Sequence, residues 1–141
     1  MLRAFFRWLT KHNHLAANPA SELEMPREER RLPQTLSAAE TEQVLAVPDL
    51  ATPLGLRDRA ILETPYSTGI RRMELGGLKL HDVDHARRVV FVRQGKGRKD
   101  RYVPIGERAL GWVRRYLDEA RPKLVCALDD GWLFLDASGR K

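Results

Sequence analysis

The chain has 141 residues, of which 31% are charged and 43% are hydrophobic, and its formal net charge is +6 at pH 7. This length and composition predict one ordinary globular domain with room for a fragment of a second, and they exclude a membrane-spanning helix because no apolar run approaches the roughly 18 residues that a span requires. The single cysteine, Cys126, excludes an internal disulfide framework. Because the first 15 residues also lack the pattern of a secretory signal, we expect a protein of the reducing cytoplasm.

The N-terminal third predicts a helix followed by a linker. Apolar residues recur at helical spacing between Leu2 and Leu9, and basic residues occupy the other faces, so residues 1–12 are expected to form an amphipathic helix. The segment 25–36 contains two prolines and a run of alternating charges, which is typical of an interdomain linker. We therefore expect a domain boundary near residues 25–35.

A second unit is expected to begin at Ser37, which has the spacing of a capping box with Glu40. Residues 54–67 predict the next helix, with the charged residues at 57–59 facing mostly outward. Pro65 predicts a kink or an early end to this helix, because an interior proline lacks a backbone donor and clashes with the preceding turn.

Gly69 is expected to stop that helix, and residues 70–78 predict a third, short one. Within this short helix, Glu74 has the spacing that places its side chain beside Arg71 or Arg72.

The remainder of the chain predicts a hairpin, a helix and a strand. Residues 89–92 and 102–105 are β-rich runs joined by a glycine-containing tip, residues 107–121 carry a helical apolar stripe, and residues 132–135 predict a brief strand. The expected fold class is therefore mixed α+β, mainly helical, with a small antiparallel β-hairpin or sheet.

The positive charge is concentrated in one part of the chain. Residues 71–121 hold 14 basic and 7 acidic side chains, a surplus of 14 − 7 = +7 that exceeds the net charge of the whole chain. Such a concentration is typical of a surface that binds a polyanion, although a solvated basic surface has the same composition.

The basic motifs suit phosphate chemistry. An arginine at a helix start, such as Arg71, can direct two donors at a phosphate and stays charged at any relevant pH. Lys96 is a mobile point charge whose pKa can be tuned toward proton donation, and the flanking glycines allow the hairpin tip to bend. Other cations near the tip could add phosphate contacts that do not depend on base sequence: Arg93, Arg98, Lys99 and Arg101. A solvated charged turn remains the alternative for the tip alone.

Four segments, in this order, resemble the tyrosine recombinases, in particular the Xer-like and phage integrase branch. They are Arg-Asp-Arg-Ala-Ile-Leu-Glu at 57–63, Thr-Gly-Ile-Arg-Arg-Met-Glu-Leu at 68–75, Gly-Leu-Lys-Leu-His-Asp-Val-Asp at 77–84, and Gly-Lys-Gly-Arg-Lys-Asp-Arg-Tyr-Val-Pro-Ile at 95–105. The run 5–9 followed by Asn18 and Pro19 is similar to the end of the helical core-binding domain of that family.

The resemblance implies domains and partners. Residues 1–24 would be the C-terminal helix of a core-binding domain, 25–36 a linker, and 37–141 the N-terminal part of the catalytic domain. The implied partners are double-stranded DNA and other recombinase protomers in a tetrameric synapse, in the cytoplasm and at the nucleoid. No metal and no cofactor are expected.

The resemblance also implies residue roles. Arg71 matches the first catalytic arginine, which clamps the scissile phosphate, and Glu74 matches the acidic residue that supports it. Lys96 matches the hairpin lysine that is proposed to protonate the departing 5′ oxygen. The implied DNA-binding residues are Arg72, Arg93, Arg98, Lys99 and Arg101.

The sequence departs from the family pattern at both ends. The family has a later His-x-x-Arg box and a nucleophilic tyrosine, and neither follows Asp136. We therefore expect a recombinase truncated at both ends, which would not cleave DNA alone although the complete enzyme would act through a 3′-phosphotyrosyl intermediate. A non-catalytic DNA-binding module that modulates recombinases, and a decayed fragment without activity, are the alternatives.

Overall fold

The computed structural model describes residues 2–24, 34–93, 95, 99–126 and 129–140. The chain divides into two compact units, Met1–Thr35 and Leu36–Lys141. None of the helices in the described ranges is long and apolar enough to cross a membrane.

The first unit contains the predicted N-terminal helix, α1 (Leu2–Lys11). The chain folds back after it, and the Nε of Arg3 donates to the Ala20 carbonyl at 3.0 Å. The Ala20 amide donates in turn to the side chain of Asn18 at 2.9 Å. Trp8 stacks on His12 at the end of α1, with ring centroids 4.3 Å apart, so this short unit is held by local contacts.

The second unit combines helices with a three-stranded antiparallel sheet in the order β1-β2-β3. Its elements are α2 (Ala38–Ala46), α3 (Pro53–Thr68), α4 (Arg72–Gly76), the 3₁₀ turn η1 (Leu80–Asp82), β1 (Val83–Asp84), β2 (Val89–Val92), β3 (Arg101–Pro104), α5 (Glu107–Arg115), the π-helical segment η2 (Tyr116–Ala120) and α6 (Arg121–Leu124). The mainly helical α+β fold class is confirmed.

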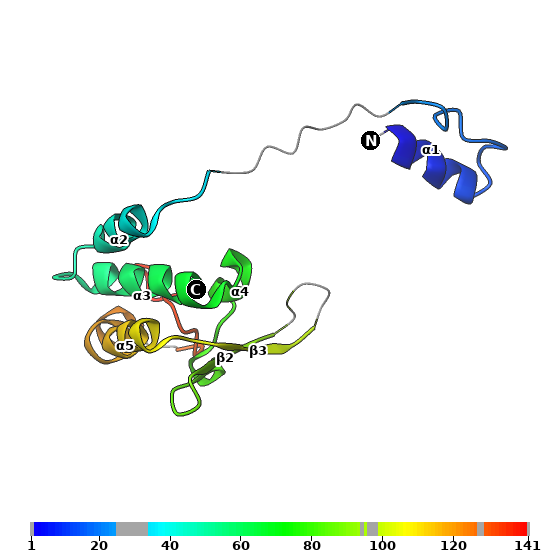
Figure 1. Ribbon diagram of the computed structural model, residues 1–141. Coiled ribbons are helices and arrows are strands. Elements are labelled where there is room, and N and C mark those ends of the chain that lie inside the picture. The colour runs from blue at the N-terminus through cyan, green and yellow to red at the C-terminus, as the bar shows by residue number, and fades with distance from the viewer. Residues whose placement is uncertain (1, 25–33, 94, 96–98, 127–128, 141) are drawn as a thin grey trace. The chain divides into compact units, whose positions relative to one another are not determined.

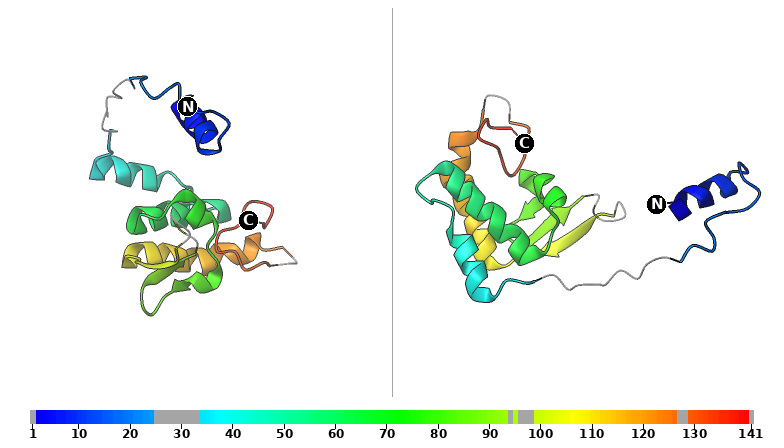
Figure 2. Two further views of the ribbon diagram at one scale, coloured as in Figure 1. Left: turned by 90° about the vertical axis from the view of Figure 1, so that its right-hand side faces the viewer. Right: turned by 90° about the horizontal axis from the view of Figure 1, so that it is seen from above.

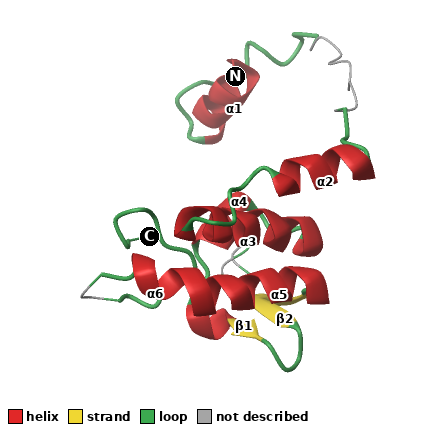
Figure 3. Cartoon of the chain, turned by 90° about the vertical axis from the view of Figure 1, so that its left-hand side faces the viewer, coloured by secondary structure: helices red, strands yellow, loops and turns green. Residues whose placement is uncertain are grey.

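The arrangement places the hairpin beside the start of α4. Figure 1 shows α2, α3 and α5 stacked on one another, with the hairpin of β2 and β3 extending away from α5 on the side of α4. Figure 3 shows α3 and α5 lying side by side, with α6 continuing beyond α5. Buried side chains from these elements form a single core, including Ala60, Val90, Val113, Tyr116 and Leu133.

Several local signals in the sequence are confirmed. Ser37 and Glu40 form the capping box that begins α2. Gly69 ends α3 in the left-handed region, at φ 65°. The two β-rich runs form the predicted hairpin, in which Val90 pairs with Val103. The helix expected at 107–121 continues to residue 124 and changes to π geometry over Tyr116–Ala120.

Other expectations are wrong. Of the two alternatives expected at Pro65, the early end is wrong: α3 continues to Thr68, and the Gly69 N–H donates to the Pro65 carbonyl at 2.8 Å. Arg59 was expected to face outward, yet it is buried. Within the described residues 129–140, the segment expected as a strand forms only an isolated bridge between Trp132 and Lys79. The short strand β1 was not predicted.

Candidate functional site

Arg71 stands at the entrance to α4 with its side chain largely in solvent. Gly69 turns the chain at the end of α3, and Ile70, which is buried, anchors the connection to the core. Arg71 is the residue immediately before α4, and 57% of its side-chain surface is exposed. The local sequence therefore presents one arginine to solvent from a fixed backbone position.

The Glu74 carboxylate holds this arginine and a second one. It accepts a hydrogen bond from the Arg71 backbone N–H at 2.8 Å, and the Arg71 guanidinium lies 3.4 Å away. The two terminal nitrogens of Arg101 donate to the two Glu74 oxygens at 2.9 and 2.8 Å. Only 7% of the Glu74 side chain is exposed. The carboxylate thus joins α4 to β3 through charge-assisted hydrogen bonds.

The hairpin backbone packs directly against this pair. A Cβ added to Gly95 would overlap the Arg101 guanidinium and would lie 2.9 Å from a Glu74 oxygen. Gly95 is buried, and its amide donates to the Lys99 carbonyl at 3.0 Å. A glycine at this position therefore permits the close approach of the hairpin to the Glu74–Arg101 pair.

The other predicted cations differ in how available they are. Arg72 and Lys99 are exposed. Arg93 is paired with the buried carboxylate of Asp82, through an Nη1 to Oδ2 distance of 2.9 Å, and 42% of its side chain is exposed. Lys96 and Arg98 lie outside the described residues. The structure therefore brings Arg71, Glu74 and Arg101 together, and it shows that Arg101 and Arg93 already have acidic partners.

An arginine–glutamate network that the sequence analysis missed lies between α2, α3 and α5. Glu63, which is 1% exposed, accepts from the Arg59 Nε at 3.0 Å and from the Arg108 Nε at 2.9 Å. Arg108 also binds Glu42 of α2. The i,i+4 spacing of Arg59 and Glu63 could have revealed one pair, whereas the contacts of Arg108 are long-range.

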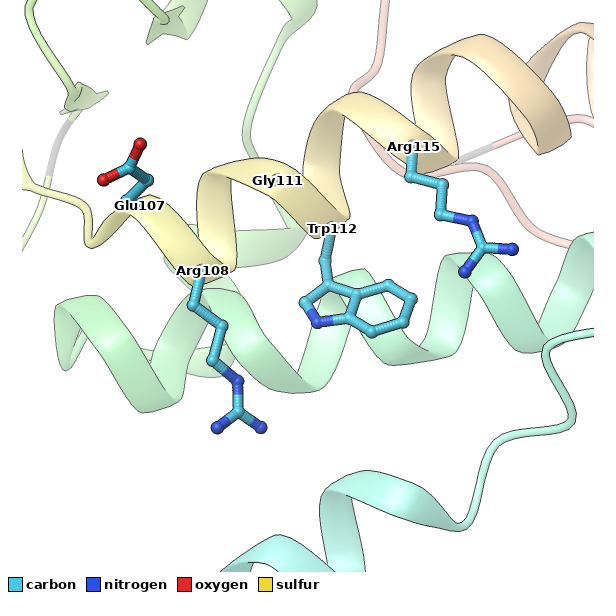
Figure 4. A pocket seen from close by; sticks show the side chains of 5 residues that line it. All are labelled: Glu107, Arg108, Gly111, Trp112 and Arg115. Atoms are coloured by element: carbon cyan, nitrogen blue, oxygen red, sulfur yellow. The ribbon is translucent and has the colours of Figure 1, made fainter.

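The surface beside this network forms a pocket of about 370 Å³. Figure 4 shows Arg108, Trp112 and Arg115 pointing from α5 toward α3 and α2, whereas Glu107 points away from them. The charges of Arg108 are paired with Glu42 and Glu63, and Arg115 pairs with Glu119. We therefore infer that the residues lining this pocket serve the packing of α5 and do not form a ligand-binding site. Among the described residues, no cluster of three or more histidine, cysteine or acidic groups could hold a metal ion.

The Glu74 cluster should make the stability of the protein sensitive to acid. Hydrogen bonds from Arg101, and then from the Arg71 backbone, lower the pKa of Glu74 from 4.5 to about 2. A lowered folded-state pKa stabilises the protein above pH 4.5, and this contribution is lost as the pH falls toward 2.

The unfolding free energies of the parent chain and of Glu74→Gln, measured in urea from pH 6 to pH 2.5, should therefore converge with falling pH. The slope of their difference can reach at most about 1.4 kcal/mol per pH unit for one group. A difference that stays constant across this range would contradict the assignment.

Comparison with known proteins identifies the family. Residues 34–141 match the phage integrase family. The chain is 59% identical over 127 residues to tyrosine recombinase XerC 2 of Ralstonia nicotianae, covering 89% of this chain and 37% of that protein. It is 42% identical to tyrosine recombinase XerD of Pseudomonas aeruginosa, covering 99% of this chain and 47% of that protein. The chain thus spans less than half the length of these relatives.

Solved structures show the same fold. The crystal structure of the XerA recombinase superposes with a TM-score of 0.61 at 29% identity, covering 96% of this chain and 45% of that one. The Tn1549 transposon integrase, solved in complex with circular intermediate DNA, superposes with a TM-score of 0.71 at 22% identity, covering 98% of this chain and 48% of that one. The family match over residues 34–141, together with the Xer relatives, shows that the chain belongs to the phage integrase family of tyrosine recombinases.

Proposed function

We propose that this chain carries the arginine-bearing part of the active site of a site-specific DNA recombinase. The observation that carries the proposal is the exposed guanidinium of Arg71, which is held at a fixed backbone position by a nearly buried glutamate. Near Arg71 in the chain, the exposed cations Arg72 and Lys99 supply further charge suited to the DNA backbone. Its Xer relatives are tyrosine recombinases by name, which supports the same reaction here.

In the proposed reaction, the oxygen of a tyrosine hydroxyl attacks the scissile phosphorus and forms a 3′-phosphotyrosyl bond. The hydroxyl proton passes to solvent, and the bond between phosphorus and the 5′ oxygen breaks. Arg71 donates hydrogen bonds to the non-bridging oxygens, on which negative charge builds up in the transition state. Lys96 gives a proton to the departing 5′ oxygen, and the rejoining step returns it. No high-energy cofactor is needed, because the energy of the phosphodiester is kept in the phosphotyrosyl bond.

The proposal includes an organisation for the chain. We assign residues 1–24 to the end of a core-binding domain, 25–36 to a linker, and 37–141 to the first part of the catalytic domain. The division of the structure near residue 35 and the family match from residue 34 support this assignment. Duplex DNA and further recombinase protomers are the proposed partners, and the nucleoid is the proposed site of action.

Salt-dependent DNA binding tests the proposal. The chain should bind duplex DNA at low salt, and Arg71→Ala should reduce the slope of log affinity against log salt by about 0.9, as expected for one lost phosphate contact. Arg71→Lys should keep the slope but lose affinity, because a point charge cannot direct two parallel donors.

The matched control is Arg115→Ala, which removes an exposed arginine paired with Glu119 on α5. It should leave the slope unchanged. The proposal fails if duplex DNA does not bind at low salt, or if the two alanine variants have equal effects.

A further inference from the structure

Arg101 is held in a way that does not suit a free phosphate contact. Both of its terminal nitrogens bind the two oxygens of Glu74, in the parallel geometry that gives an arginine–carboxylate pair its strength. Only 36% of the Arg101 side chain and 7% of the Glu74 side chain are exposed. A phosphate approaching Arg101 would therefore have to displace this carboxylate or lie next to its negative charge.

The same carboxylate also binds the backbone N–H of Arg71. One Glu74 oxygen accepts from the Arg71 N–H at 2.8 Å while it also accepts from Arg101 at 2.8 Å. Arg101 lies on β3, 27 residues after Glu74. The contact thus ties the hairpin to the start of α4, and the right-hand view of Figure 2 shows these two parts of the chain next to each other.

Gly95, which follows the end of β2 at Val92, completes the contact. Its backbone lies so close to the Arg101 guanidinium that a Cβ would overlap it. Lys96 follows Gly95 directly in the sequence. The close approach of Gly95 places the described part of the hairpin against the Glu74–Arg101 pair.

We propose that Arg101 is a positioning residue, which acts through Glu74 to hold Arg71 and the base of the hairpin in one fixed arrangement. This inference deepens the proposed function and rests on it for the role of Arg71. It replaces the expectation that Arg101 contacts DNA. Glu74 is the shared partner, and Gly95 is the position that must stay without a side chain.

The first test observes the arrangement without DNA. In amide NMR spectra of the 141-residue chain, Arg101→Met should shift the backbone resonances of Arg71 and Gly95, and Arg101→Lys should restore part of the parent position. Gly95→Ala should shift the Arg71 amide in the same direction as Arg101→Met, because the added methyl group displaces the guanidinium. Arg115→Met is the control and should leave these amides in place. If the chemical shift of the Arg71 amide does not change in Arg101→Met, the inference is overturned.

The second test is a double-mutant cycle of duplex DNA affinity at low salt. If Arg101 acts through Arg71, Arg101→Met should weaken binding about 5-fold in the parent chain and less than about 2-fold in the Arg71→Met chain. Equal losses in the two chains, with a further drop of about 0.9 in the salt slope, would show a direct phosphate contact instead. If the parent chain does not bind DNA, the proposed function fails, and the NMR result alone decides whether Arg101 positions Arg71.

Discussion

Replacing Glu63 with alanine should lower the free energy of unfolding by about 3–5 kcal/mol, because it leaves a buried cation without its counter-ion. Glu63 is 1% exposed and Arg59 is 8% exposed. The Arg59 guanidinium donates to Glu63 from its Nε at 3.0 Å and from one terminal nitrogen at 2.8 Å. Without the carboxylate, Arg59 keeps its contact with the Leu45 carbonyl and its position over the Trp112 ring, 4.7 Å from the centroid.

The effect should extend across three helices. Arg108 of α5 bridges Glu63 on α3 and Glu42 on α2, so the same substitution also loosens the packing of α5. Urea unfolding followed by far-UV circular dichroism measures the change. Glu42→Ala is the matched control: its side chain is half exposed, so the loss should be much smaller than for Glu63→Ala. Equal losses of unfolding free energy for the two variants would show that Glu63 contributes no more to stability than Glu42 does.

The features that could be predicted from the sequence are those set by neighbouring residues. The capping box at Ser37 and the glycine that ends α3 each depend on local backbone chemistry, and both are present. Two β-rich runs joined by a glycine-containing tip were likewise enough to predict the β2–β3 hairpin, in which Val90 lies opposite Val103. The fold class followed from these local elements.

The errors arose where tertiary packing overrides a local rule. Arg59 was expected in solvent because it is charged, but Glu63 and the Leu45 carbonyl provide the partners that make its burial possible. Pro65 did not end α3, because its position in the last turn removes a single backbone bond. The segment 132–135 has the composition of a strand, yet its strand pairing is an isolated bridge between Trp132 and Lys79. No sequence rule places a pairing partner at that distance.

In the candidate site, too, the contact between neighbouring residues could be predicted from the sequence, whereas the long-range contact could not. The spacing of Arg71 and Glu74 predicted that they lie side by side, since residues three apart share one side of a helix. The partnership of Glu74 with Arg101 spans 27 residues and depends on how the hairpin folds against α4. Charge alone therefore suggested a DNA contact for Arg101, whereas the geometry gives it an acidic partner.

Replacing Tyr116 with alanine should also cost about 3–5 kcal/mol, because it empties a large, fully buried site. Tyr116 is 0% exposed, and its ring stacks on Phe134 with centroids 5.5 Å apart. Its hydroxyl accepts a hydrogen bond from the Leu135 N–H at 3.2 Å. These contacts, together with the hydrogen bonds from Arg121 to the Trp132 carbonyl and from the Leu133 N–H to the Leu78 carbonyl, hold the segment 132–135 in place.

Tyr116→Phe separates the two contributions, because it keeps the ring and removes only the acceptor. It should cost about 1–3 kcal/mol, the expected penalty for a buried N–H left without its partner. Arg57 still holds the Leu135 carbonyl at 2.9 Å in this variant, so the segment should stay in place while hydrogen exchange at the Leu135 amide accelerates. If Tyr116→Phe is as destabilising as Tyr116→Ala, the hydroxyl rather than the packed ring fixes this segment, and the order of the two contributions is reversed.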